Sequence, residues 1–190
     1  LVALLNSLLA TVSQTAIAFF GIYFKLQSFI YMPANGLIQG MRPLISYNYG
    51  ARHFDRVKKI IKVSINSTAV ILCCGTIIFM GLPELVLSWF NATEQLLEIG
   101  IIGLRVISPC FILSTMGVVI SGVFESLGKG RQSLTISLLR QFIITLPLAY
   151  ILLKVIGLNG IWLSFVIAEG IASVIAVILI KKELHNFKVD

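Results

Sequence analysis

The stretch GLIQGMRPLISYNYGARHFDRVKK, residues 36–59, places glycines, a proline, amides and a basic cluster between two strongly apolar segments. Pro43 in this stretch and Pro33 just before it each remove a backbone N–H donor. In lipid, the carbonyl left without that donor must be satisfied by neighbouring helices, side chains or water. Gly36 and Gly40 have the four-residue spacing that lets membrane helices approach closely. The stretch therefore predicts a packed helix with local distortions.

The second half of this stretch has the features of a turn. Asn48 and Gly50 tolerate the left-handed conformation in which many helices end, so we expect a helix to finish near Tyr47. Asp55 is placed to cap the helix that follows. The pattern predicts two helices joined by a tight, basic connection.

The composition is that of a membrane protein. The chain is 57% hydrophobic and 12% charged, with a mean hydropathy of +0.97, whereas soluble domains are about 45–50% apolar and about 25% charged. Residues 69–86 contain one charged residue, Glu84, and residues 156–180 contain one, Glu169. Apolar runs of about 18 residues or more are typical of membrane-spanning helices.

The apolar runs predict an all-α, polytopic membrane helix bundle with five full spans and one partial span. The partial span covers residues 1–10, and the full spans cover residues 16–45, 56–81, 98–124, 132–153 and 161–180. We expect one transmembrane domain over residues 1–190, with short connections. Because the chain opens inside an apolar segment without Met, we expect it to be a fragment.

The basic residues are distributed unevenly between the two sides of the predicted bundle. One side holds ten basic residues in its connections and tail, and the other holds only Lys154. The ten are Arg52, Arg56, Lys58, Lys59, Lys62, Lys129, Arg131, Lys181, Lys182 and Lys188. The positive-inside rule places this side, and with it the C-terminus, in the cytoplasm. It also accounts for the net charge of +7 through contact with anionic membrane lipid rather than nucleic acid.

The two tryptophans, Trp89 and Trp162, fall near the predicted outer ends of spans. Because tryptophan is enriched at membrane–water interfaces, we expect both to be interfacial anchors.

Three motifs resemble the second half of transporters of the multidrug and toxic compound extrusion (MATE) family. Their order and spacing match over essentially the whole chain. The first motif is Pro33-x-x-Gly36-x-x-Gln39-Gly40-x-x-Pro43-Leu44-x-x-Tyr47-Asn48-Tyr49-Gly50-Ala51-Arg52. The second joins residues 125–130 and 138–141 with Pro147, and the third is residues 157–162.

This resemblance implies a fold and an activity. MATE transporters have twelve helices in two six-helix lobes and exchange H⁺ or Na⁺ for organic cations and other drugs. The chain would be the C-terminal lobe, from part of helix 7 to helix 12, in the plasma or inner membrane. Its partners would be the missing N-terminal lobe, membrane lipid and small cationic, amphipathic substrates.

Several polar residues lie inside the predicted spans, where they are costly and often functional. Lys25 and Glu169 are each about ten residues from the outer end of a span, or about 15 Å deep at about 1.5 Å per residue. They are candidates for the transport cavity or for a fixed ion pair. Gln27 and Tyr31 extend the polar face around Lys25, and Asn6 could join them.

Arg140 and Gln141 form a second polar pair inside a span. A pairing of Arg140 with Glu125 or with Glu169 would brace two helices. Both residues are nevertheless candidates for the transport cavity.

One branch of the MATE family carries a carboxylate midway along its tenth helix. The corresponding residues here, 114–121, contain none, so the choice between H⁺ and Na⁺ remains open. We find no catalytic set, no metal motif and no sign of another cofactor, and we predict a protein that is not an enzyme. Two alternatives are a lipid-linked oligosaccharide flippase of the same superfamily and a membrane scaffold that does not transport.

Overall fold

The computed structural model describes residues 1–187, and within them every regular element is helical. Five stretches are long and apolar enough to cross a membrane: residues 14–50, 54–81, 109–126, 130–156 and 158–185. The predicted all-α, multi-pass membrane bundle is confirmed. In chain order the elements are α1 (Val2–Ala10), α2 (Gln14–Gly50), α3 (Phe54–Gly81), α4 (Pro83–Ser88), α5 (Glu94–Ile107), α6 (Pro109–Ser126), α7 (Gly130–Leu138), the π-helix η1 (Leu139–Ile143), α8 (Thr145–Ile156) and α9 (Leu158–Asn186).

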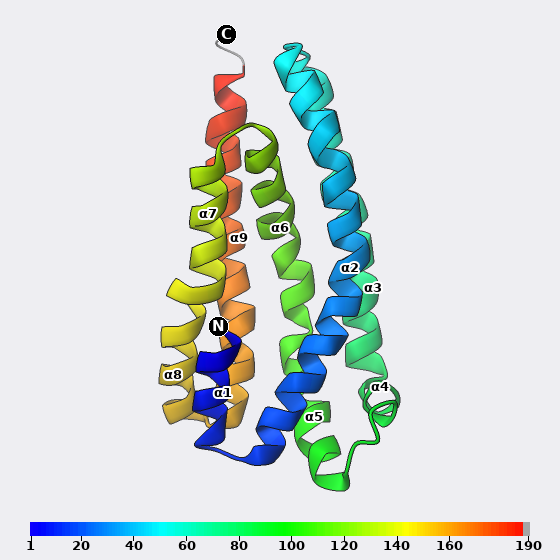
Figure 1. Cartoon of the computed structure of the whole chain (residues 1–190), viewed down its shortest axis with the longest axis vertical. Coiled ribbons are helices and arrows are strands. Elements are labelled where there is room, and N and C mark those ends of the chain that lie inside the picture. Colours follow the sequence, from blue (N-terminus) through cyan, green and yellow to red (C-terminus); the bar gives the residue numbers. More distant parts are fainter. Residues whose placement is uncertain (188–190) are drawn as a thin grey trace.

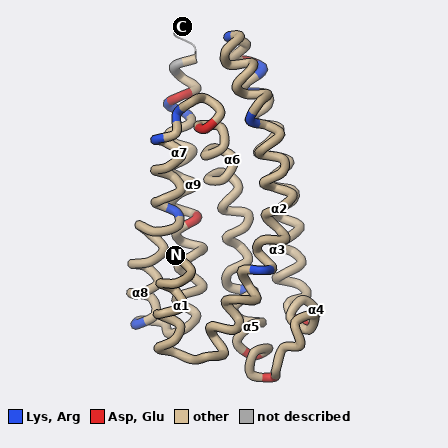
Figure 2. Tube along the Cα trace, in the orientation of Figure 1, with Lys and Arg blue, Asp and Glu red and all other residues tan. Residues whose placement is uncertain are grey.

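The long helices run side by side, with α6 between the α2–α3 pair and the group formed by α7, α8 and α9 (Figure 1). The α2–α3 and α6–α7 connections lie at the end of the bundle that holds the C-terminus. The α1–α2 and α8–α9 connections lie at the other end (Figure 1). Lysines and arginines gather at the C-terminal end (Figure 2). The connections predicted to share a side do so, although Lys188 lies outside the described residues.

The end of α2 differs from the sequence prediction. The helix continues past Tyr47 to Gly50, and the left-handed residue is Arg52, with φ 58°, rather than Asn48 or Gly50. The N–H of His53 donates to the carbonyl of Asn48 at 2.9 Å. This hydrogen bond, which reaches back five residues, is typical of a Schellman motif, in which the left-handed residue is the first one after the C-cap of the helix. The motif therefore moves the turn beyond the positions that look permissive in the sequence.

Asp55 does not cap α3, so that prediction is wrong. The helix begins at Phe54, which puts Asp55 inside the first turn, and no side chain caps the helix. The Asp55 carboxylate instead accepts from the Lys58 ammonium at 3.2 Å.

The predicted single span over residues 98–124 is broken at Pro109. α5 ends at Ile107, and α6 begins at Pro109, which has no N–H to continue the hydrogen-bond ladder. The hydroxyl of Thr76 on α3 donates to the carbonyl of Ser108 at 3.2 Å. The same carbonyl also accepts from the N–H of Phe111 at 3.0 Å, so the Thr76 contact ties α3 to the junction between α5 and α6.

The core at the end away from the C-terminus is built from aromatic rings. Phe19 and Trp162 are fully buried and meet edge to face, with centroids 5.0 Å apart. The prediction of an interfacial anchor at Trp162 is wrong, because α9 is packed against α5, α6 and α8. Trp89 is 70% exposed and remains a candidate anchor.

The glycines that allow close helix packing are not the predicted pair. Nothing lies within 4 Å of a Cβ built on Gly36 or Gly40, considering residues 1–187. A Cβ on Gly122 of α6, in contrast, would come within 2.6 Å of Ile38 on α2. The close approach of α2 to α6 therefore depends on Gly122, while Gly36 and Gly40 lie on an open face.

The basic end of the bundle is tied together by polar contacts between the first two motifs. Arg42 on α2 pairs with Glu125 on α6 at 2.5 Å, and the Ser46 hydroxyl donates to the Ser126 carbonyl at 2.8 Å. The latter contact satisfies one of the last carbonyls of α6. The motifs therefore join α2 to the end of α6.

Candidate functional site

A polar groove lies along α2 and η1. Its main hollow has a volume of about 670 Å³ and adjoins a second of about 310 Å³. Arg140 and Gln141 line both hollows, which we treat as one site. The polar groove is defined here by Gln27, Tyr31, Asn35, Gln39, Arg140, Gln141 and Glu169.

One wall of the polar groove is a stripe along α2. Gln27, Tyr31, Asn35 and Gln39 follow one another at intervals of four residues, which places them on one face of a helix. All four line the main hollow. This wall offers hydrogen-bonding groups without a formal charge.

The opposite wall carries an ion pair. Nε of Arg140 on η1 lies 3.2 Å from Oε1 of Glu169 on α9, and the two side chains are 18% and 12% exposed. Oε2 of Glu169 is buried and has no hydrogen-bond partner within the described part of the chain. The carboxylate is therefore held by one oxygen and retains an acceptor for a proton or another cation.

The π-helix explains how Arg140 and Gln141 reach the same groove. The N–H of Ile144 donates to the carbonyl of Leu139 at 3.1 Å, five residues back, which widens the turn. Pro147 lies four residues after Ile143 and cannot donate to its carbonyl, so the α-helical ladder is interrupted here in any case. The Thr145 hydroxyl donates to the Arg140 carbonyl at 2.5 Å, which satisfies a group near the interruption.

A hydrogen bond connects the polar groove to the core of the bundle. The hydroxyls of Tyr31 and Ser114 are 2.6 Å apart, and the Ser114 hydroxyl also lies 2.8 Å from the Phe111 carbonyl. If Ser114 donates to that carbonyl, it accepts from Tyr31, and this orients the phenol in the groove wall. Within residues 1–187, no group of three or more His, Cys, Asp or Glu residues could hold a metal ion.

The amino-acid sequence of the chain matches the model of a known protein family. The family model MatE matches residues 1–151, more than three quarters of the chain. The chain belongs to the MatE family. The resemblance inferred from the three motifs is confirmed.

Curated relatives of the MatE chain include multidrug export proteins. The chain is 31% identical over 186 residues to multidrug export protein MepA of Staphylococcus haemolyticus (strain JCSC1435). The match covers 97% of this chain and 40% of the relative. The chain is 30% identical to MepA of Staphylococcus aureus (strain MSSA476), covering 98% of this chain and 41% of the relative. The chain therefore spans about 40% of the length of these relatives.

Solved structures share the fold at lower identity. An outward-facing multidrug resistance MATE family transporter of the MOP superfamily superposes with a TM-score of 0.93 at 20% identity, over 98% of this chain and 43% of that one. An inward-facing structure superposes with a TM-score of 0.85 at 20% identity, over 90% of this chain and 40% of that one. The helix arrangement of the MatE chain is therefore that of part of a MATE transporter.

The structure brings together most of the predicted cavity residues, but not Lys25 or Asn6. Glu169 pairs with Arg140 rather than with Lys25, which is exposed and forms no ion pair with any described carboxylate. Asn6 does not line the two hollows of the polar groove, and its Oδ1 is buried without a hydrogen-bond partner among residues 1–187. Of the two alternatives for Arg140, the pairing with Glu125 is wrong, because Glu125 binds Arg42.

Three features of the polar groove are not among the sequence predictions for the cavity. Two are the side chains of Asn35 and Gln39, and the third is the π-helix. The two side chains continue the spacing of four from Gln27 and Tyr31, so this pattern could have identified them. The π-helix had a weaker signal, namely Pro147 close after the Arg140–Gln141 pair.

Proposed function

We propose that the chain is the C-terminal lobe of a two-lobe secondary transporter that exports cationic, amphipathic drugs in exchange for H⁺ or Na⁺. The MatE match and the fold support this proposal, as does the 40% share of the multidrug export relatives that the chain spans. In such transporters the substrate cavity lies between two related lobes near the middle of the membrane. The polar groove would be this lobe's wall of that cavity.

The observation that carries the proposal is the Glu169 carboxylate, with one oxygen on Arg140 and the other without a described partner. Such a carboxylate can take a proton or a metal cation, or it can face the ammonium group of a drug. Oε2, which has no described partner, can receive either the coupling ion or the ammonium group of the drug, but not both at once. Loading of the coupling ion would therefore weaken binding of the drug, and the two would exchange.

The described groove residues carry no net positive charge, which disfavours movement of a lipid-linked oligosaccharide. A flippase cavity must hold a pyrophosphate and needs an excess of basic groups. Among the groove residues the charge of Arg140 is cancelled by that of Glu169. We infer that the C-terminal end of the bundle lies in the cytoplasm, because the basic connections gather there (Figure 2).

The test is efflux of a cationic dye from cells that express the full-length protein. Glu169→Gln keeps the size of the side chain and removes the charge, and we expect it to abolish efflux or its dependence on external pH, with efflux normalised to the amount of protein in the membrane. Glu98→Gln is the matched control, because Glu98 is an exposed carboxylate on α5 outside the groove. Normal, pH-dependent efflux by Glu169→Gln would contradict the proposal.

Lys25 remains a candidate for the cavity through its position rather than through an observed partner. Its ammonium group is exposed on a membrane-spanning helix, where an uncompensated charge is costly. We infer that the other lobe or a water-filled cavity covers it. Lys25→Ala should then lower efflux, and unchanged efflux and protein levels would remove Lys25 from the site.

A further inference from the structure

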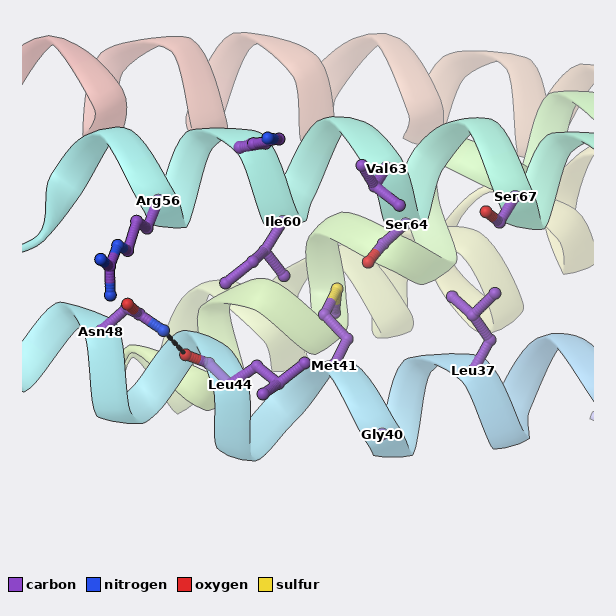
Figure 3. Close-up of a pocket in the computed structure, with 11 residues that line it drawn as sticks. Leu37, Gly40, Met41, Leu44, Asn48, Arg56, Ile60, Val63, Ser64 and Ser67 are labelled. Carbon is purple, nitrogen blue, oxygen red and sulfur yellow. Dashed lines mark hydrogen bonds between the residues drawn. The ribbon is translucent and has the colours of Figure 1, made fainter.

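A second groove lies between α2 and α3 and shares no lining residue with the polar groove (Figure 3). Its volume is about 620 Å³. The walls are mostly aliphatic: Leu37 and Leu44 contribute from α2, and Ile60 and Val63 contribute from α3. We call this feature the amphipathic groove, because its two ends differ in chemistry.

One end of the amphipathic groove is basic. Arg56, Lys59 and Asn48 line it at the end of the bundle that holds the C-terminus. Arg56 extends from α3 towards Asn48 on α2 (Figure 3). At the other end the lining residues are Leu37 and Ser67.

The length of the amphipathic groove matches one leaflet of a membrane. Its lining spans eleven residue steps on each helix, from Leu37 to Asn48 on α2 and from Arg56 to Ser67 on α3. At about 1.5 Å per residue, this is about 16 Å. Half of a hydrocarbon core of about 30 Å is about 15 Å. The groove therefore begins at the interface and ends near the bilayer centre.

The cations at the mouth have no ion-pair partner among the described residues. No carboxylate in residues 1–187 forms an ion pair with Arg56 or Lys59, and the neighbouring Asp55 is paired with Lys58 at 3.2 Å. Asn48 donates through Nδ2 to the Leu44 carbonyl at 2.8 Å, but its Oδ1 is buried and accepts no hydrogen bond from a described group. The mouth thus offers two positive charges above an apolar slot.

We propose that the amphipathic groove binds one anionic phospholipid of the leaflet at the basic end, with its phosphate at Arg56 and Lys59. An acyl chain lies along Leu37, Leu44, Ile60 and Val63. Phosphatidylcholine fits less well, because its headgroup is zwitterionic and carries no net negative charge. Basic pockets between membrane helices bind acidic headgroups in this way.

The experiment is native mass spectrometry of the full-length protein, titrated in detergent with phosphatidylglycerol or phosphatidylcholine. The variant Arg56→Gln/Lys59→Gln removes the two charges at the mouth. The control Lys62→Gln/Arg131→Gln removes the same two charge types from exposed positions that do not line the groove. At about 1 kcal/mol per basic residue, we expect the mouth variant to bind phosphatidylglycerol about thirty-fold more weakly. The control should lose no more than a few-fold.

A second variant tests the apolar part without changing charge. Gly40 lines the amphipathic groove, and nothing lies within 4 Å of its Cβ position. Gly40→Leu should therefore fill the slot and displace the acyl chain. Equal binding of the two lipids would overturn the proposal, as would equal losses in the mouth and control variants.

Protein from the rest of a longer chain is the competing occupant. A cysteine introduced at Val63, with Cys73, Cys74 and Cys110 replaced by alanine, reports on this in the intact membrane. Val63 is 55% exposed, so a lipid-soluble maleimide should label it, and added phosphatidylglycerol should slow the reaction. A thiol that resists labelling even in detergent without phosphatidylglycerol would mean that protein fills the groove, and would overturn the lipid site.

Discussion

Removal of one partner of the Arg140–Glu169 pair should destabilise the protein more than removal of both. At the observed 3.2 Å and an effective dielectric constant of about 20, the attraction is about 5 kcal/mol. Desolvation of the two charges offsets much of this attraction. A single neutralisation leaves the other charge unpaired in a largely buried position, which costs about 3 kcal/mol. We therefore expect Glu169→Gln and Arg140→Gln each to lower the free energy of unfolding by about that amount.

The double variant Arg140→Gln/Glu169→Gln should lie within about 1 kcal/mol of the parent protein, because no unpaired charge remains. The assay is equilibrium unfolding of the full-length protein in mixed micelles with increasing SDS, followed by tryptophan fluorescence. Arg105→Gln and Glu98→Gln are the control pair, because both residues are exposed and form no ion pair with described residues. Additive losses in the Arg140–Glu169 cycle would refute the reasoning. A double variant that folds but does not export dye would show that the pair is needed for transport and not only for holding the helices together.

Three further predictions concern single positions. A Cβ on Gly160 would overlap the Leu152 carbonyl oxygen, so Gly160→Ala should lower the free energy of unfolding by about 1–3 kcal/mol. Gly40→Ala on the open face should instead raise it by up to about 1 kcal/mol. Equal effects of the two variants would contradict the helix contacts. Gly128 has φ +72°, so Gly128→Ala should cost about 1 kcal/mol, and a measured gain would exclude the left-handed turn. Tyr31→Phe removes the hydroxyl at the groove wall and should weaken dye binding by about 1 kcal/mol, measured by fluorescence polarisation; unchanged binding would exclude the phenol from the site.

The helical spans and their alternation were predictable from sequence because lipid imposes a simple requirement. A chain crossing a membrane as helix must be apolar for about 20 residues, and the runs around α3 and α9 satisfy this over most of their length. The position of basic residues then groups the connections by side. Neither the positions of the spans nor the side of each connection depends on which helices are in contact.

Helix interruptions were less predictable. Pro33 and Pro43 lie inside a continuous α2, whereas Pro109 separates two helices. The residue type is the same in each case, so a proline alone does not decide whether a helix is interrupted. Its local effect depends on the packing around it, which the sequence of one segment does not contain.

The sequence by itself determined that this chain is a membrane helix bundle of the MatE type, which polar residues lie within its spans, and that Gln27, Tyr31, Asn35 and Gln39 share a helix face. These properties follow from local periodicity and composition. Only the tertiary structure decided that Glu169 pairs with Arg140 rather than Lys25, that Gly122 rather than Gly36 or Gly40 brings helices together, and that Trp162 is buried. Such choices depend on how each helix is rotated about its own axis and which helix lies beside it. Packing of the whole bundle sets both, and no single segment encodes them.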